Sequence, residues 1–175
     1  MGLDMYFYGT KNFSVFPRDA VRQPLEKTFE FTSLINNHGM ENAPIDYDTA
    51  WASYDIKFPL MYWRKSNQIH KWFVDNVQEG NDNCQRHYVS KEKLVELFET
   101  INTILNCSDP LNREQVAKEL LPTDIEGCFF GSEEYDDYYF EELEDTKKVL
   151  DKVFAYEKTA EAGHCFDGFY YQSSW

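Results

Sequence analysis

The chain has 175 residues, of which 42% are hydrophobic and 17% aromatic, a composition typical of a single globular domain with a core rich in rings. Acidic residues outnumber basic ones by 31 to 17, and the net charge of −14 argues against a general nucleic-acid binder, which would present a basic surface. No apolar run approaches the length of a membrane span and no signal peptide is recognisable, so we expect a cytoplasmic protein with reduced cysteines.

The N-terminal half begins with a clear strand pattern and then loses its regularity. Residues 3–8 alternate apolar and polar side chains with a period of two, which predicts a strand. From about residue 11 to residue 58 the chain contains several prolines and no sustained periodicity. We interpret this stretch as strands and loops that form a variable insertion within one domain spanning residues 1–175.

Three helices are predicted in the middle of the chain. The first spans 59–78, because proline suits a first turn and Gly80 follows its end. The second spans 90–106 and begins at Ser90, a natural N-cap followed by apolar residues at helical spacing. The third spans 109–121, with an aspartate as cap and a proline in its first turn.

The C-terminal part is predicted to contain a short strand at 127–131, a long helix from Ser132 to about residue 156, and an aromatic strand within 166–175. The aromatic residues of the last strand either pack within the chain or across a homodimer interface, since rings left in water would promote aggregation. The predicted fold is therefore α+β, with about four helices packed on a small antiparallel sheet that includes both chain termini as its outer strands.

A polar strip on the first predicted helix is a candidate ligand site. Trp63, Asn67 and His70 have the spacing i, i+4, i+7, and Arg64 flanks that line. An aromatic ring, an amide, an imidazole and a guanidinium together could bind a small anionic or nucleotide-like ligand. The alternative is an amphipathic helix whose polar side chains only satisfy their neighbours or water.

A run of acidic residues opens the last predicted helix, and we name it the acidic ridge. Because no Glu-x-x-His motif accompanies it, the ridge lacks the usual partner of a bundle-type metal site, and we expect no metal. As a solvated surface it could dock on a basic protein. Its members are Glu133, Glu134, Asp136, Asp137, Glu141 and Glu144.

Catalytic signatures are incomplete in this sequence. The four cysteines form no Cys-x-x-Cys pair, and no phosphate-binding glycine loop occurs. Cys84 with His87 or His70 could form a thiolate site, and a hydrolase or transferase built on them is the weaker alternative. We therefore favour a non-enzymatic protein without a cofactor.

Several blocks resemble a family of small proteins of phages and prophages. They are the start Met-Gly-Leu-Asp-Met-Tyr, Tyr62-Trp63-Arg64-Lys65-x-Asn67-x-Ile69-His70-x-Trp72-Phe73-Val74, Leu120-Leu121-Pro122-Thr123, Phe129-Phe130-Gly131-Ser132-x-x-Tyr135-Asp136 and Tyr171-Gln172-Ser173-Ser174-Trp175. The resemblance covers both ends and the middle of the chain but not residues 11–58. It implies no activity, cofactor or catalytic residue, and it implies a protein made inside a bacterial host cell.

Together these observations predict a protein that acts by binding. The first hypothesis is an acidic inhibitor or modulator of a host protein with a basic surface, such as a defence or nucleic-acid enzyme, docked through the acidic ridge. The second is a small-ligand or nucleotide module that uses the 62–72 segment. Direct binding to nucleic acid and to membranes is not expected.

Overall fold

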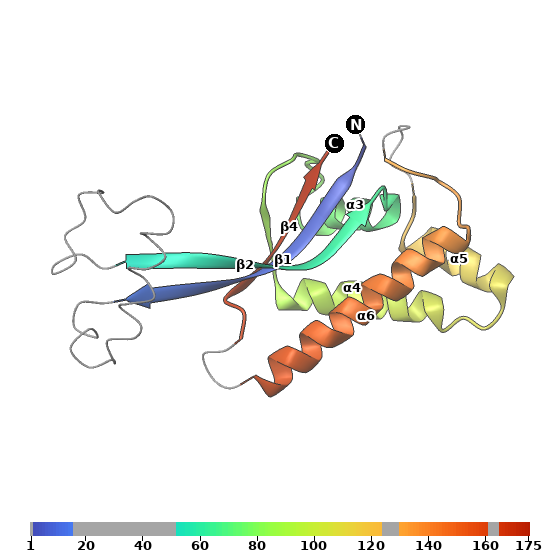
Figure 1. Cartoon of the computed structure of the whole chain (residues 1–175). Helices are drawn as coiled ribbons and strands as arrows, with labels where there is room; N and C mark the ends of the chain where they lie inside the picture. Colours follow the sequence, from blue (N-terminus) through green and yellow to red (C-terminus); the bar gives the residue numbers. More distant parts are fainter. Residues whose placement is uncertain (1, 16–51, 124–129, 161–164) are drawn as a thin grey trace. The chain divides into compact units, whose positions relative to one another are not determined.

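The computed structural model describes residues 2–15, 52–123, 130–160 and 165–175, and its elements are drawn in Figure 1. The chain divides into two compact units, residues 1–11 with 57–175, and residues 12–56. In the second unit the side chain of Asn12 donates a hydrogen bond of 2.8 Å to Asp55 Oδ1. The first unit contains all the helices and most of the sheet among the described residues.

The sheet has four antiparallel strands in the order β2-β1-β4-β3. They are β1 (Asp4–Val15), β2 (Ala52–Arg64), β3 (His87–Val89) and β4 (Gly168–Ser174). Strand β4 pairs with β1 along its whole length and with β3 on its other side. The first and last strands therefore lie side by side (Figure 1), which confirms the α+β fold with both termini in the sheet. The expectation that they form the outer strands is wrong, because β2 and β3 flank them.

Four helices pack on this sheet in the described part of the chain. They are α3 (Asn67–Asn76), α4 (Lys91–Leu105), α5 (Pro110–Leu120) and α6 (Asp137–Thr159). Helix α4 packs against both α5 and α6 (Figure 1). Ser90 accepts a hydrogen bond from the amide of Lys93, and Asp109 accepts one from the amide of Leu111, so both predicted N-caps are confirmed.

The long C-terminal helix is confirmed, but its cap is not Ser132. The N-cap lies four residues later than predicted, at Asp136, which accepts from the amide of Tyr139 at 3.0 Å. The buried stripe of α6 follows helical spacing, and its members are Tyr139, Leu143, Thr146, Leu150 and Val153. Of the strand predicted at 127–131, residues 127–129 lie outside the described residues, and Phe130 and Gly131 are not in a strand.

The helix predicted over 59–78 is wrong in its first half. Residues up to Arg64 continue β2, and α3 begins only at Asn67. Lys65 has a left-handed backbone with φ of 59°, and its amide donates a hydrogen bond of 2.8 Å to the carbonyl of Leu3 in the segment that leads into β1. The run of large apolar and aromatic residues before Trp63 suits a strand, and pairing with β1 outweighs the helical spacing that the same residues show.

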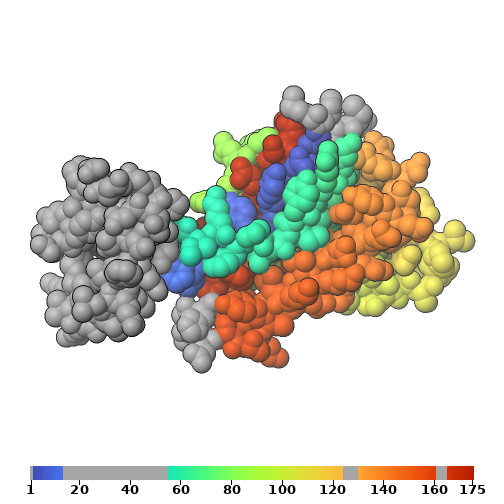
Figure 2. Space-filling view, viewed as in Figure 1, coloured from blue at the N-terminus to red at the C-terminus, as the bar shows by residue number. Residues whose placement is uncertain are grey.

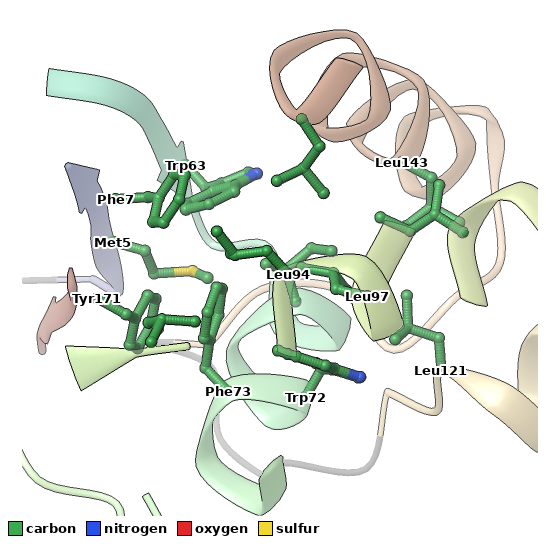
Figure 3. Close-up of a cluster of buried hydrophobic side chains, with 14 of the residues drawn as sticks. Met5, Phe7, Trp63, Trp72, Phe73, Leu94, Leu97, Leu121, Leu143 and Tyr171 are labelled. Carbon is green, nitrogen blue, oxygen red and sulfur yellow. The ribbon is translucent and has the colours of Figure 1, made fainter. Parts of the chain in front are cut away.

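One face of the sheet and the helices enclose the core (Figure 3). Met5 and Phe7 of β1, Trp63 of β2 and Tyr171 of β4 point toward the same space. The helices fill it with further buried side chains, among which are Phe73, Leu94, Leu97 and Leu143. Phe73 and Tyr171 stack face to face, with ring centroids 3.9 Å apart and an interplanar angle of 8°. The last strand therefore contributes to the centre of the core.

We predict that Gly131→Ala destabilises the fold strongly. Gly131 has φ of 110°, which side-chain-bearing residues rarely adopt, and an added Cβ would lie 2.1 Å from the carbonyl oxygen of Lys65 at the turn between β2 and α3. Backbone strain and the clash together should lower the free energy of unfolding by about 3 kcal/mol or more. Urea unfolding followed by circular dichroism measures this loss.

Gly80 supplies the matched control for that substitution. Its φ is also positive, at 76°, but an added Cβ would have nothing within 4 Å. Gly80→Ala should therefore cost only the backbone strain, about 1 kcal/mol. Equal losses in the two variants would contradict the close approach of Gly131 to Lys65.

Candidate functional site

The predicted ligand strip does not form a surface in the structure. Trp63 lies in β2, not on a helix, and its indole nitrogen donates a hydrogen bond of 2.8 Å to the hydroxyl of Thr146 in α6. Asn67 and His70 lie in α3 and are fully buried. Of the four residues only Arg64 is exposed. A ligand at the surface of this structure could therefore contact Arg64 but not the other three.

His70 is instead the centre of a buried hydrogen-bond network. Its Nδ1 lies 2.7 Å from the hydroxyl of Tyr171, and its Nε2 lies 3.2 Å from Oδ2 of Asp82. Because a carboxylate can only accept, Nε2 carries the proton of the neutral ring and Tyr171 donates to Nδ1. Burial lowers the pKa of His70, and the nearby carboxylate of Asp82 opposes this shift. A neutral imidazole therefore links α3 to the last strand.

The same network attaches the C-terminal residues to the loop before β3. Asp82 Oδ1 accepts a hydrogen bond of 3.3 Å from the indole of Trp175, and Gln172 donates to the carbonyl of Cys84 at 3.0 Å. Phe130 contacts both the ring of His70 and the ring of Trp175. The aromatic residues of the last strand thus pack within the chain.

The structure gives Cys84 no histidine partner. Cys84 is exposed, and among the described residues no hydrogen bond joins its sulfur to an imidazole. Both ring nitrogens of His70 are engaged, and Nε2 of His87 lies 2.9 Å from Asn83 Oδ1. A thiolate mechanism needs a base within hydrogen-bond reach of the thiol, and the described residues around Cys84 do not provide one.

All six residues of the acidic ridge are exposed. Asp137, Glu141 and Glu144 follow one line of α6 at spacings of four and three residues. None of the ridge carboxylates forms an ion pair with a residue in the described part of the chain, whereas Asp145 pairs with Lys148 at 2.8 Å. Helix α6 shows one side to solvent along its length (Figure 2). The ridge is therefore a strip of exposed carboxylates without ion pairs to described residues, although the charge of Lys148 acts on Glu141 and Glu144.

Glu142 differs from the ridge although it lies on the same helix. Its carboxyl is partly buried, and this burial raises the pKa of Glu142, while the hydroxyls of Tyr138 and Ser66 beside it oppose the rise. Because Ser66 precedes α3, Glu142 connects α6 to the start of that helix. We assign it a structural role.

The face of the sheet opposite the core carries five tyrosines, which we name the tyrosine face: Tyr6, Tyr8, Tyr62, Tyr88 and Tyr170. Tyr6, Tyr62 and Tyr88 are 43%, 51% and 59% exposed. Tyr8 stacks on Tyr170 with centroids 5.8 Å apart, and Tyr6 contacts Tyr62 at 5.5 Å. Atoms of β1, β2 and β4 reach the surface in the view of Figure 2.

A hollow of ≈ 460 Å³ lies on the tyrosine face. Its lining residues come from β1, β2 and β4, and they are Tyr6, Phe7, Tyr8, Lys57, Pro59, Met61, Tyr62 and Gln172. Lys57 lies over the ring of Tyr8, with Nζ 5.2 Å from its centroid. Sequence reasoning missed this site, although the alternation of Tyr6 and Tyr8 with Met5 and Phe7 marks two faces of one strand.

Two kinds of site are absent from the described residues. No group of three or more histidine, cysteine, aspartate or glutamate side chains there could hold a metal ion. Among the helices that the structure describes, none has the length and apolarity that crossing a membrane requires.

Comparison with known proteins gives no relative from which the role of the acidic ridge or of the hollow could be inferred. No protein-family model, no curated protein and no solved structure matches the chain.

Proposed function

We propose that the protein acts by binding a host protein with a basic surface, and that the acidic ridge is its docking face. The observation that carries this proposal is the exposure of six carboxylates, before α6 and within its first half, that form no ion pair with any described residue. The proposed partner is a defence or nucleic-acid enzyme, whose basic surface the ridge would occupy, and the proposed setting is the cytoplasm of a bacterial cell.

Electrostatics supports this choice of partner. In a chain with a net charge of −14, unpaired carboxylates add repulsion within the folded state, and a basic partner would relieve it. Complementary charge also steers the encounter of the two proteins and makes the association sensitive to salt. The resemblance to small phage and prophage proteins favours a partner on the host side.

We predict that neutralising three ridge residues, Asp137→Asn, Glu141→Gln and Glu144→Gln, weakens binding of the host partner. The partner is identified by mass spectrometry after capture from a bacterial lysate at low salt, and its dissociation constant is then measured by calorimetry at two salt concentrations. We expect the triple variant to bind at least about tenfold more weakly at low salt, because the lost charges steer and hold a basic surface. Raising the salt should reduce this difference.

The matched control removes the same charge elsewhere. Glu79, Glu99 and Glu119 are exposed and lie outside α6. Changing these three to glutamine alters the net charge equally and should leave the affinity within about twofold of the unchanged protein. Equal weakening by the two triple variants, or binding that ignores salt, would refute the ridge as the docking face.

A further inference from the structure

The hollow on the tyrosine face has the dimensions of a small-molecule site. Its volume of ≈ 460 Å³ falls within the roughly 300–1,000 Å³ typical of ligand pockets. Aromatic and apolar side chains line most of it, and Lys57 is the one charged side chain among its lining residues in the described chain. No acidic residue lines it, although the protein carries a net charge of −14.

Two tyrosines form a wall on which a flat group can stack. The rings of Tyr6 and Tyr62 lie 5.5 Å apart at an angle of 46°. The hydroxyl of Tyr62 donates a hydrogen bond to Asp4, which fixes the orientation of a ring that is otherwise half exposed. Stacking of a heterocyclic base on such an aromatic ring contributes about 1–3 kcal/mol.

The other wall combines a stacked pair of tyrosines with positive charge. Tyr8 stacks on Tyr170 with ring centroids 5.8 Å apart, and its hydroxyl is buried beside Arg86. The guanidinium of Arg86 lies over the ring of Tyr170, and Arg86 is not among the described residues that line the hollow. Lys57 lies over the ring of Tyr8, with Nζ 5.2 Å from its centroid. An anionic group at this end would meet the ammonium group of Lys57.

We propose that this hollow binds a planar aromatic anion of the nucleoside-monophosphate class, with the base on Tyr62 and the phosphate toward Lys57. Gln172 lies opposite Tyr6 in the sheet, and its amide nitrogen is engaged with the carbonyl of Cys84. The site uses residues other than the acidic ridge and is a second binding activity of the protein.

The net charge selects a mononucleotide over a nucleic-acid strand. A nucleic-acid chain bound in the hollow would extend over the surface of a protein with a net charge of −14. Each of its phosphates outside the hollow would be repelled. A single phosphate needs only Lys57, the one charged side chain among the described residues that line the hollow. A mononucleotide also fits the size of the hollow, which a longer strand would exceed.

The test is isothermal titration calorimetry of the full chain with AMP, GMP, CMP and UMP at low salt. We expect at least one of the four to bind saturably below about 1 mM. Tyr62→Ala should weaken that binding about tenfold or more through loss of stacking. Lys57→Met, which keeps the apolar stem, should weaken binding of the monophosphate several-fold and leave binding of the uncharged nucleoside unchanged.

Tyr88→Ala is the matched control, because Tyr88 is an exposed tyrosine on the same face that does not line the hollow. The Tyr88→Ala variant should bind the monophosphate with the same affinity as the unchanged protein. Thermal unfolding of each variant separates loss of the site from loss of the fold. The proposal is overturned if none of the four monophosphates binds up to about 1 mM, or if folded Tyr62→Ala binds like the unchanged protein. Equal affinity for a nucleoside and its monophosphate would overturn the role of Lys57.

Discussion

Deletion of residues 171–175 is expected to leave the chain without a stable fold. These residues form most of β4, an interior strand that pairs with β1 and carries Tyr171 into the core. Loss of one fully buried large aromatic side chain alone costs about 3–5 kcal/mol, against a total stability of about 5–15 kcal/mol for an ordinary domain. Loss of these residues also removes the backbone partners of β1 on the side of β4, from Asp4 to Phe7. Circular dichroism and the dispersion of amide proton resonances measure the outcome.

Deletion of Trp175 alone is the control for this truncation. The side chain of Trp175 is half exposed, and it contacts Phe130 and donates to Asp82 at the edge of the structure. We expect this shorter deletion to keep the fold and to cost about 1 kcal/mol. A chain lacking residues 171–175 that unfolded cooperatively with unchanged stability would contradict the interior position of β4.

Stability is expected to fall as the pH drops below 6.5, and His70 should cause part of this fall. Burial lowers the pKa of His70 from its ordinary value of 6.5, so the unfolded chain binds the proton more readily than the folded one. Above pH 6.5 the ring is neutral in both states and contributes no pH dependence. Below it, protonation favours the unfolded state, and the loss of stability grows as the pH falls.

Urea unfolding of His70→Gln across this pH range tests the assignment. The substitution removes the titrating ring, so the variant should be less stable at neutral pH but should lose less stability between about pH 6.5 and pH 5 than the unchanged protein does. His87→Gln is the matched control, because His87 lies outside the buried network of His70 and its ring contacts Asn83. An equal change of slope in both variants would contradict the assignment to His70. An identical slope in His70→Gln and the unchanged protein would show that another group is responsible.

Local patterns predicted the elements whose signals are short-range. Ser90 and Asp109 cap their helices because a side-chain oxygen next to a helical run satisfies free amides whatever the rest of the fold does. The stripe of α6 was predictable for a similar reason, since burial of residues such as Leu143 and Leu150 follows from helical periodicity. The alternation in residues 3–8 likewise identified the first strand.

Pairing between distant segments overrode local patterns elsewhere. The residues before Trp63 fit a helix by spacing, yet they join the sheet because β1 offers them backbone partners. The three-residue strand β3 has too few residues to show a period, and it exists only because β4 lies beside it. Both cases depend on which segments meet, and spacing along one segment does not contain that information.

Among the candidate sites, the charge and position of the acidic ridge could be predicted from sequence alone, because exposed carboxylates need no tertiary partner. The burial of His70 and Trp63, and the hollow that Tyr6, Tyr62 and Lys57 border, follow from the tertiary fold. The physical reason is that a sheet brings together alternate residues of strands that are far apart in the chain, so its open face is defined by strand order and register.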